Sequence, residues 1–251
     1  MKLFVNIFFA IVTISFSLSF INKRLSHNNK NYTYVPDVYK KIYGATSISV
    51  DGDFVVIKTK GMPDHKSAYY ASLDSLYQNF DGTTFGGSRF RKNPNKITEH
   101  YYTFKIPLNP QEAKNHRATP LGPIGVALNG VPFFNQYAGP NRPLSSEITS
   151  FDQYWGHPTQ HGAYHYHVEP IYLTNVKATK PSLLGFLLDG FPVYGPEENG
   201  KVVTNDMLDK YHGHVSVTLD FPNGIYHYHI TNVDPYINGN GFFGTAGSIS
   251  R

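Results

Sequence analysis

Two short stretches of the sequence place histidines at a spacing suited to binding a metal ion. Residues 164–167 and 226–229 both read Tyr-His-Tyr-His, and each stretch begins two residues after a glycine. Side chains alternate between the two faces of a β-strand, so each stretch is expected to put its two histidines on one face and its two tyrosines on the other. Histidines two positions apart lie about 6–7 Å apart at their Cα atoms, which lets both imidazoles reach one ion at ~2.0–2.1 Å.

A third histidine accompanies each pair, at the end of the blocks Asp152–His157 (DQYWGH) and Asp209–His214 (DKYHGH). Three neutral imidazole nitrogens leave one coordination position open, as in a catalytic rather than a structural zinc site. The aspartate of each block is expected to accept the second ring N–H of a ligand histidine and so fix its tautomer. The predicted metal ligands are His157, His165, His167, His214, His227 and His229. The predicted supporting residues are Asp152, Asp209, Tyr166 and Tyr228.

The distribution of histidines favours metal binding over a purely structural network of histidines and tyrosines. Eight of the 12 histidines fall between His157 and His229, and six of these occupy matching places in the two halves of that region. Charged histidines are costly to bury, and six that faced one another would repel at mildly acidic pH unless an ion held them. His161 and His212 have no counterparts and are expected at the surface. Whether the six bind two ions, a bridged pair or one shared ion stays open.

Copper and zinc are the expected ions, because the chain has no cysteine and the blocks bring few fixed carboxylates. Zinc would activate water for hydrolysis. Copper would suit redox chemistry, with Tyr166 and Tyr228 close enough to influence it.

The elements that must position these residues are mostly β-strands. Alternating apolar runs flank two-residue turns at Asp51-Gly52, Asn129-Gly130 and Asp189-Gly190, and a Pro-Asn-Gly turn at 222–224. Proline and glycine total 39 residues and interrupt any long helical period. The predicted fold is mostly β, a single antiparallel β-rich domain with few short helices.

Three blocks recur in the same order, which predicts an internal two-fold duplication of about 121–180 and 183–245. GVALNGVPFF matches GFLLDGFPVY, DQYWGH matches DKYHGH, and GAYHYHV matches GIYHYHI. Two copies are too few for a solenoid, so we expect one β domain with pseudo-twofold symmetry.

The N-terminal sequence indicates export. Residues 1–19 carry Lys2, an apolar run and small residues near Ser19, a pattern typical of a signal peptide; the alternative is a membrane anchor. Residues 20–42 are polar and are expected to form a flexible leader, and residues 43–251 the β domain. We therefore expect a secreted, periplasmic or cell-surface protein with no membrane span after signal cleavage. The net charge of +4 and the absence of long basic runs argue against nucleic acid as a partner.

The chain resembles the YHYH family of secreted proteins. The motifs that carry the resemblance are GMPDH, NPNKIT, GVALNGVPFF, FDQYWGHPTQHGAYHYH, GFLLDGFPVYGP, LDKYHGH and YHYHITNVDPYINGNGFFG. The family's name implies a sequence pattern rather than a reaction. The resemblance also implies a role for His65, as a further ligand or general base, against the alternative of an exposed turn histidine. Relatives carry cysteines in these blocks, where this chain has Tyr154 and Tyr211.

Two classes of function follow from these patterns. The first is an exported His-rich protein that binds copper or zinc and, if catalytic, acts as a metal-dependent hydrolase or a copper redox protein. The second is a non-catalytic extracellular module that contacts a glycan or a small molecule, with structural His-Tyr clusters. A metal that only stabilises the fold is a third outcome.

Overall fold

The computed structural model describes residues 34–251, and the predicted signal peptide and most of the predicted leader lie outside the described residues. The predicted boundary of the β domain at residue 43 lies inside the packed unit. The short helix α1 (Asp37–Lys40) contributes Tyr39, and the turn after it contributes Ile42, to the hydrophobic core. These two apolar side chains give residues 37–42 enough buried surface to be ordered, although their neighbours are polar.

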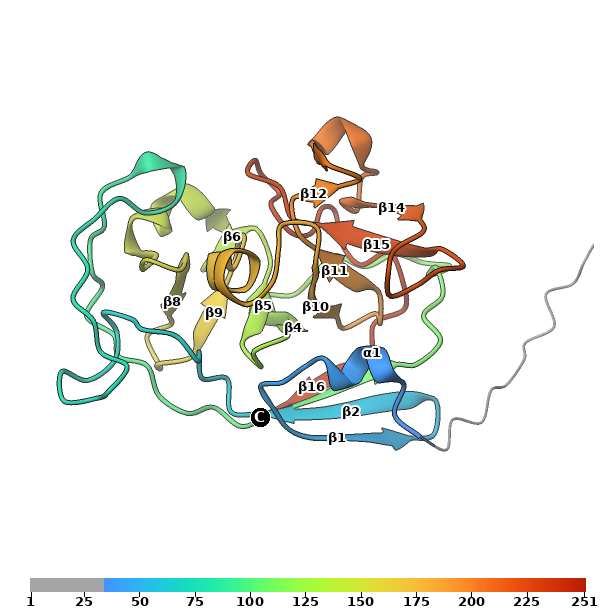
Figure 1. The fold of residues 1–251 in the computed structure, drawn as a ribbon, viewed down its shortest axis with the longest axis horizontal. Coiled ribbons are helices and arrows are strands. Elements are labelled where there is room, and N and C mark those ends of the chain that lie inside the picture. Colours follow the sequence, from blue (N-terminus) through green and yellow to red (C-terminus); the bar gives the residue numbers. More distant parts are fainter. Residues whose placement is uncertain (1–33) are drawn as a thin grey trace, which may run out of the picture. The chain divides into compact units, whose positions relative to one another are not determined.

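The described residues are mostly β, as predicted, and form two larger sheets (Figure 1). The smaller sheet has the strand order β1-β2-β3-β16, with bounds Ala45–Asp51, Phe54–Thr59, Tyr102–Pro107 and Ser248–Ser250. Its first hairpin turns at Asp51-Gly52, where Asp51 pairs with Phe54. Val55, Ile57, Phe104 and Ile106 are completely buried, so this sheet closes one side of the core.

The larger sheet has eight strands in the order β14-β15-β11-β10-β4-β5-β9-β8. Its first half comprises β4 (Pro123–Ala127), β5 (Pro132–Phe134), β8 (Gly156–Pro158) and β9 (Tyr164–Tyr166). Its second half comprises β10 (Leu183–Leu187), β11 (Pro192–Tyr194), β14 (Gly213–Ser216) and β15 (Ile225–His229).

The order of the larger sheet is symmetric about its centre, where β4 pairs with β10. Val126 lies opposite Phe186, and the pairs on either side are Gly125 with Leu187 and Ala127 with Gly185. Each residue of β4 corresponds to the residue 60 positions later in β10. Exchanging the two strands by this correspondence therefore gives the same set of residue pairs, as a two-fold axis at Val126 and Phe186 would. The arrangement is consistent with the predicted duplication.

The sheet is mixed rather than purely antiparallel. β5 pairs with β9, and β11 with β15, in the parallel direction. Parallel neighbours need a long crossover connection, and here each crossover contains a small hairpin and an outer strand. The hairpins are β6 (Tyr137–Ala138) with β7 (Arg142–Pro143), and β12 (Glu197–Glu198) with β13 (Lys201–Val202).

Helical structure in the described residues is confined to short pieces. Besides α1 there are four 3-10 turns, η1 (Phe85–Gly87), η2 (Leu144–Ser146), η3 (Ile148–Ser150) and η5 (Asn205–Met207), and one π-helical turn, η4 (Leu173–Lys177). No helix of this part of the chain is both long and apolar enough to cross a membrane.

The centre of the larger sheet requires glycine because β4 and β10 approach closely. A Cβ atom on Gly185 would lie 2.1 Å from the carbonyl oxygen of Val126, and one on Gly125 would lie 2.4 Å from that of Phe186. Backbone atoms cannot move aside as flexible side chains do.

Replacement of Gly185 by alanine should therefore destabilise the protein by about 3 kcal/mol or more, measured by urea unfolding. Gly52→Asn is the matched control, because Gly52 has open space around it and asparagine tolerates its φ of 58°. Equal stability of Gly185→Ala and the unaltered protein would show that the two strands are not held this closely.

Candidate metal centres

The two Tyr-His-Tyr-His stretches form separate clusters. β9 and β15 are separated in the sheet by β5, β4, β10 and β11, and Figure 1 shows them on opposite sides of these central strands. Each pairs with the strand that carries the third histidine, so that His157 lies opposite His165 and His214 opposite His227. The structure therefore excludes a single site that all six histidines share.

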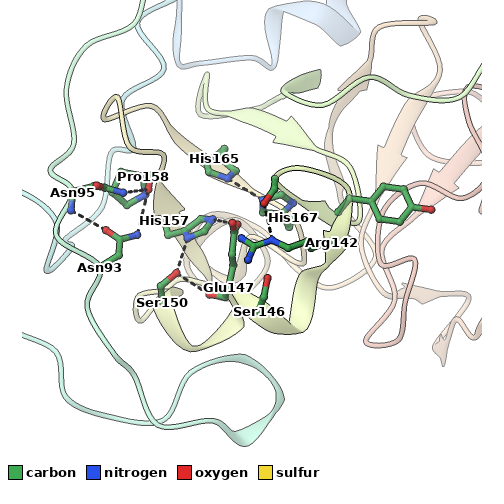
Figure 2. Close-up of polar contacts among 12 residues, drawn as sticks. Asn93, Asn95, Arg142, Ser146, Glu147, Ser150, His157, Pro158, His165 and His167 are labelled. Atoms are coloured by element: carbon green, nitrogen blue, oxygen red, sulfur yellow. Dashed lines mark hydrogen bonds and ion pairs between the residues drawn. The ribbon is translucent and has the colours of Figure 1, made fainter.

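The first cluster comprises His157, His165 and His167, which all come to within 4.8 Å of one another through one ring nitrogen each (Figure 2). Their exposed fractions are only 2–3%. The Nε2 atoms of His165 and His167 are 2.9 Å apart. Phe134 stacks on His165 at a centroid distance of 3.9 Å, and Phe151 meets the edge of His157 at 4.8 Å, so the surroundings are dry and apolar.

The other ring nitrogens of this pair show where the protons lie. His165 Nδ1 is 3.0 Å from the carbonyl oxygen of Ala163, and His167 Nδ1 is 2.5 Å from that of Asn135. A carbonyl only accepts, so both Nδ1 atoms carry the hydrogen and both Nε2 atoms present lone pairs. Two lone pairs that face each other at 2.9 Å repel, and a cation bound between them would remove that repulsion.

The tautomer of His157 follows from two consecutive hydrogen bonds. The hydroxyl of Ser150 donates to the carbonyl oxygen of Glu147 at 2.7 Å, so it accepts from His157 Nδ1, also at 2.7 Å (Figure 2). His157 Nε2 is left buried with no hydrogen-bond partner. The carboxylate of Glu147 lies 3.5 Å away, and burial raises the pKa of this carboxyl. One ring nitrogen of each histidine lies within 4.8 Å of the others, and the Nε2 atom of each is free of donors, so the three rings can serve one ion.

At neutral pH the three histidines do not hold an extra proton that could take the place of a metal ion between the rings. Burial, reinforced by the neighbouring histidines, lowers the pKa of His157 and His165 well below the usual value, and burial lowers the pKa of His167 to about 4. All three are neutral at pH 7, and the neutral imidazole is the form that binds metals.

The second cluster repeats this arrangement at the other end of the sheet. His227 Nδ1 donates to the carbonyl oxygen of Ile225 at 3.0 Å, and His229 Nδ1 to that of Gly195 at 2.8 Å. Their Nε2 atoms are 3.1 Å apart, and His214 Nε2 is buried with no hydrogen-bond partner. Burial lowers the pKa of His229 to about 4 and also lowers that of His227.

Glu198 adds a carboxylate to the second cluster. Its oxygens lie 3.3 Å from His214 Nε2 and 3.6 Å from His227 Nε2, and one of them accepts a hydrogen bond from Ser216. Burial pushes the pKa of Glu198 up, but the Ser216 hydroxyl and the three histidines outweigh it and lower the pKa overall. The second cluster thus offers three imidazoles and one anion, a donor set that zinc and copper accept.

The two clusters differ in their access to solvent. The segment before β3 lies beside β8, the outer strand of the first half, where Asn93 and Asn95 donate to the carbonyl oxygen of Pro158 (Figure 2). By contrast, Glu198, His227 and His229 line a cavity of about 750 Å³. The His-x-His pairs are equally buried in the two clusters, with exposed fractions of 0–2%. The difference lies in the third histidine, since the side chain of His214 is 23% exposed and that of His157 only 4%. The second cluster therefore borders a space that a small molecule could fill.

The sequence in which these clusters lie matches a known family. The family described as YHYH protein matches residues 103–202 and 197–241, together 139 of the 251 residues. The chain belongs to the YHYH family. All six cluster histidines, together with Ser150 and Glu198, lie inside the matched residues. No curated protein and no solved structure matches the chain.

The aspartates of the two repeated blocks, Asp152 and Asp209, accept hydrogen bonds from tyrosines rather than from histidines, which differs from the prediction. Asp152 accepts from the hydroxyl of Tyr164 at 2.9 Å, and Asp209 accepts from that of Tyr226 at 3.0 Å. Each aspartate also caps its own tight turn through backbone N–H groups. The ligand histidines donate instead to backbone carbonyls and to Ser150, because the aspartates lie on the tyrosine side of the strands.

Tyr166 and Tyr228 anchor that same side. The hydroxyl of Tyr228 donates to Asp189 at 2.6 Å, while that of Tyr166 accepts from Asn129 at 3.1 Å. Asn129 and Asp189 occupy corresponding places in the two halves. The hydroxyls therefore face away from the histidine clusters, and these tyrosines position the strands without reaching a bound ion.

His65, the further ligand that the YHYH resemblance implied, is not brought to either cluster. Its Nδ1 donates to the carbonyl oxygen of Lys66 at 2.9 Å, so its Nε2 accepts from Tyr166 at 3.0 Å. It is 2% exposed, so it is not an exposed turn histidine either. Both ring nitrogens are occupied on the tyrosine side of the sheet.

His161 is exposed as predicted, but the expectation that His212 lies at the surface is wrong. His212 is 2% exposed, and its Nε2 lies 3.2 Å from the side-chain oxygen of Asn205. It adopts a φ of 75° in the turn before β14, as Trp155 does with a φ of 64° before β8. The turn packs this ring inward, a placement that residue spacing alone does not reveal.

Removal of the Ser150 hydroxyl should weaken metal binding at the first cluster. In Ser150→Ala the ring of His157 loses the acceptor that fixes its tautomer. Loss of such a partner of a metal ligand typically lowers the metal affinity by about 10–100-fold. Zinc titration against a competing chelator measures this effect. Ser145→Ala, at an exposed position nearby, should leave the affinity unchanged. Equal affinities for both variants would remove Ser150 from the site.

Proposed function

We propose that this protein is an exported metal-binding protein that holds one zinc or copper ion at each histidine cluster. The observation that supports this most is the convergence of three Nε2 lone pairs in the first cluster, each fixed by a hydrogen bond at Nδ1. A purely structural histidine network would be expected to pair these nitrogens with donors. The proposal of export rests on the apolar N-terminal sequence.

The distances between the ring nitrogens fit one small ion in each cluster. Two nitrogens bound at ~2.0–2.1 Å to a tetrahedral ion lie about 3.3 Å apart. The Nε2 atoms of the two His-x-His pairs are already 2.9 and 3.1 Å apart, so only small ring movements are needed. Zinc and copper are favoured over magnesium or calcium because imidazole nitrogens dominate both donor sets.

The two sites are proposed to have different roles. The first is buried among aromatic rings, which suits an ion that stabilises the fold in a chain without cysteine. The second opens onto a cavity, which suits a reactive ion. A zinc ion there would lower the pKa of a bound water to about 7 and so favour hydrolysis, whereas copper would favour redox chemistry.

Metal analysis of the untagged protein, purified without chelators and offered zinc and copper, tests this function. We expect two equivalents in the unaltered protein and one in His165→Ala/His167→Ala or in His227→Ala/His229→Ala. The variant that combines all four substitutions should hold none while it keeps the β-type circular dichroism spectrum. If the unaltered protein takes up neither ion, the clusters are structural, and the chain is better regarded as a binding module for glycans or other extracellular ligands.

A further inference from the structure

The cavity beside the second cluster has the size and lining of a small-molecule site. Its volume of about 750 Å³ lies within the range of roughly 300–1,000 Å³ that is usual for such sites. Glu198, His227 and His229 contribute to its wall, which places the second cluster beside the cavity. The following inference rests on the proposed metal binding at this cluster.

The rest of the wall is mainly apolar, and part of it extends into solvent. Apolar lining residues include Leu128, Ala178, Leu183, Val217 and Leu219. Val217 is 64% exposed and Leu219 fully exposed, so both offer apolar surface at the cavity for a ligand to cover. Burial of such surface would raise the affinity for a bound hydrocarbon group.

The charges of the lining argue against an anionic ligand. Lys41 is the one cationic side chain among the lining residues, and its ammonium group is paired with Asp220. Asp220 also accepts a hydrogen bond from Tyr194 at 3.0 Å, which holds it in place. One positive charge and three negative charges, on Glu197, Glu198 and Asp220, give −2. A divalent cation at the second cluster brings the sum to zero, so an uncharged ligand fits best.

We propose that this cavity binds an uncharged, largely hydrocarbon molecule whose carbonyl oxygen reaches the ion of the second cluster. The apolar wall supplies affinity through the hydrocarbon part, and the ion supplies orientation through the oxygen. Phosphate esters are excluded as ligands of this cavity because no unpaired cation among its lining residues would balance their charge.

Alkyl carboxamides of two lengths, which stay uncharged when they bind zinc through the carbonyl oxygen, test this proposal on the zinc-loaded protein by calorimetry. Octanamide has six more methylenes than acetamide, and burial of only part of them should give it at least about tenfold higher affinity. Val217→Asp should remove about tenfold of the affinity for the longer compound and leave that for the shorter one unchanged. Val233→Asp is the matched control, because Val233 is 63% exposed and does not line the cavity.

The outcomes separate this proposal from the metal-binding function. If zinc is bound but the two amides bind equally well, or Val217→Asp has no more effect than Val233→Asp, the cavity proposal is wrong and the metal centre stands. Measurable binding of inorganic phosphate at millimolar concentration would also overturn the proposed preference for uncharged ligands. If zinc content is zero in the same sample, both proposals fall.

Discussion

Zinc added to the metal-free protein should raise the midpoint of thermal unfolding by roughly 15–30 °C at saturation. A site filled at 1,000 times its dissociation constant stabilises the native state by about 4 kcal/mol, and two sites by about 8 kcal/mol. For a chain of this size each kcal/mol shifts the midpoint by about 2–4 °C. The physical source is the set of converging lone pairs, which repel one another in the empty sites and bind the ion in the filled ones.

Variants assign this stabilisation to its two sites. His165→Ala/His167→Ala and His227→Ala/His229→Ala should each lose about half of the zinc-dependent shift. Magnesium serves as the ion control, since it prefers oxygen ligands and should give no shift. A midpoint that neither zinc nor copper moves would contradict the account.

Acid should destabilise the metal-free protein well before its carboxylates are fully protonated. Burial lowers the pKa of His167, His212 and His229 to about 4, while an unfolded histidine has a pKa near 6.5. Between these values the unfolded chain binds more protons than the native one, so stability is lost as the pH falls from about 6.5 towards 4. His65, His157, His165 and His227 shift in the same direction.

Three carboxyl groups, two of them buried and one half-buried, act in the opposite sense but are outnumbered. Burial raises the pKa of Asp189 to about 6 and raises those of Asp152 and Glu147. These groups gain protons in the native state first, so they add stability as the pH falls below 6. His167, His212 and His229, with a pKa of about 4, against Asp189, with a pKa of about 6, give an expected net loss of roughly 5 kcal/mol between pH 7 and pH 4.5.

Urea unfolding in the presence of a chelator at these two pH values measures the loss. His161→Gln is the control, because this histidine is exposed and the substitution should leave the pH dependence unchanged. Equal or higher stability at pH 4.5 would mean that the buried histidines are not held neutral.

The parts of the fold and site that could be predicted are those that depend on local sequence. Alternating runs around Asn129-Gly130 and Asp189-Gly190 predicted the hairpins that form the centre of the larger sheet. The period of two along a strand predicted that His165 and His167 share a face, and the repeated Gly-His block predicted their third partner.

The parts that could not be predicted depend on contacts between distant segments. Glu198 comes from a small hairpin, and its neighbour Glu197 makes the pair look like an ordinary solvated turn. The corresponding place in the first half is occupied by Ala138, so the duplication gave no signal for a carboxylate. The predicted bonds from Asp152 and Asp209 to ligand histidines failed because spacing cannot tell which face of the neighbouring strand an aspartate contacts.

The difference between the two clusters also arises from long-range structure. Phe134 and Phe151 enclose the first cluster, whereas Glu198 of the second cluster lies in the wall of a cavity. A sequence comparison of the two halves predicts two equal sites, while in the fold only the second is seen to border a cavity among the described residues.

An anomalous difference map from crystals of the zinc-loaded protein, recorded above and below the zinc edge, tests the central claim most directly. We predict one peak within ~2.0–2.2 Å of the Nε2 atoms of His157, His165 and His167, and a second at the same distance from those of His214, His227 and His229. Peaks confined to surface positions such as His161, or no peak at all, would contradict the account and leave both clusters as structural networks.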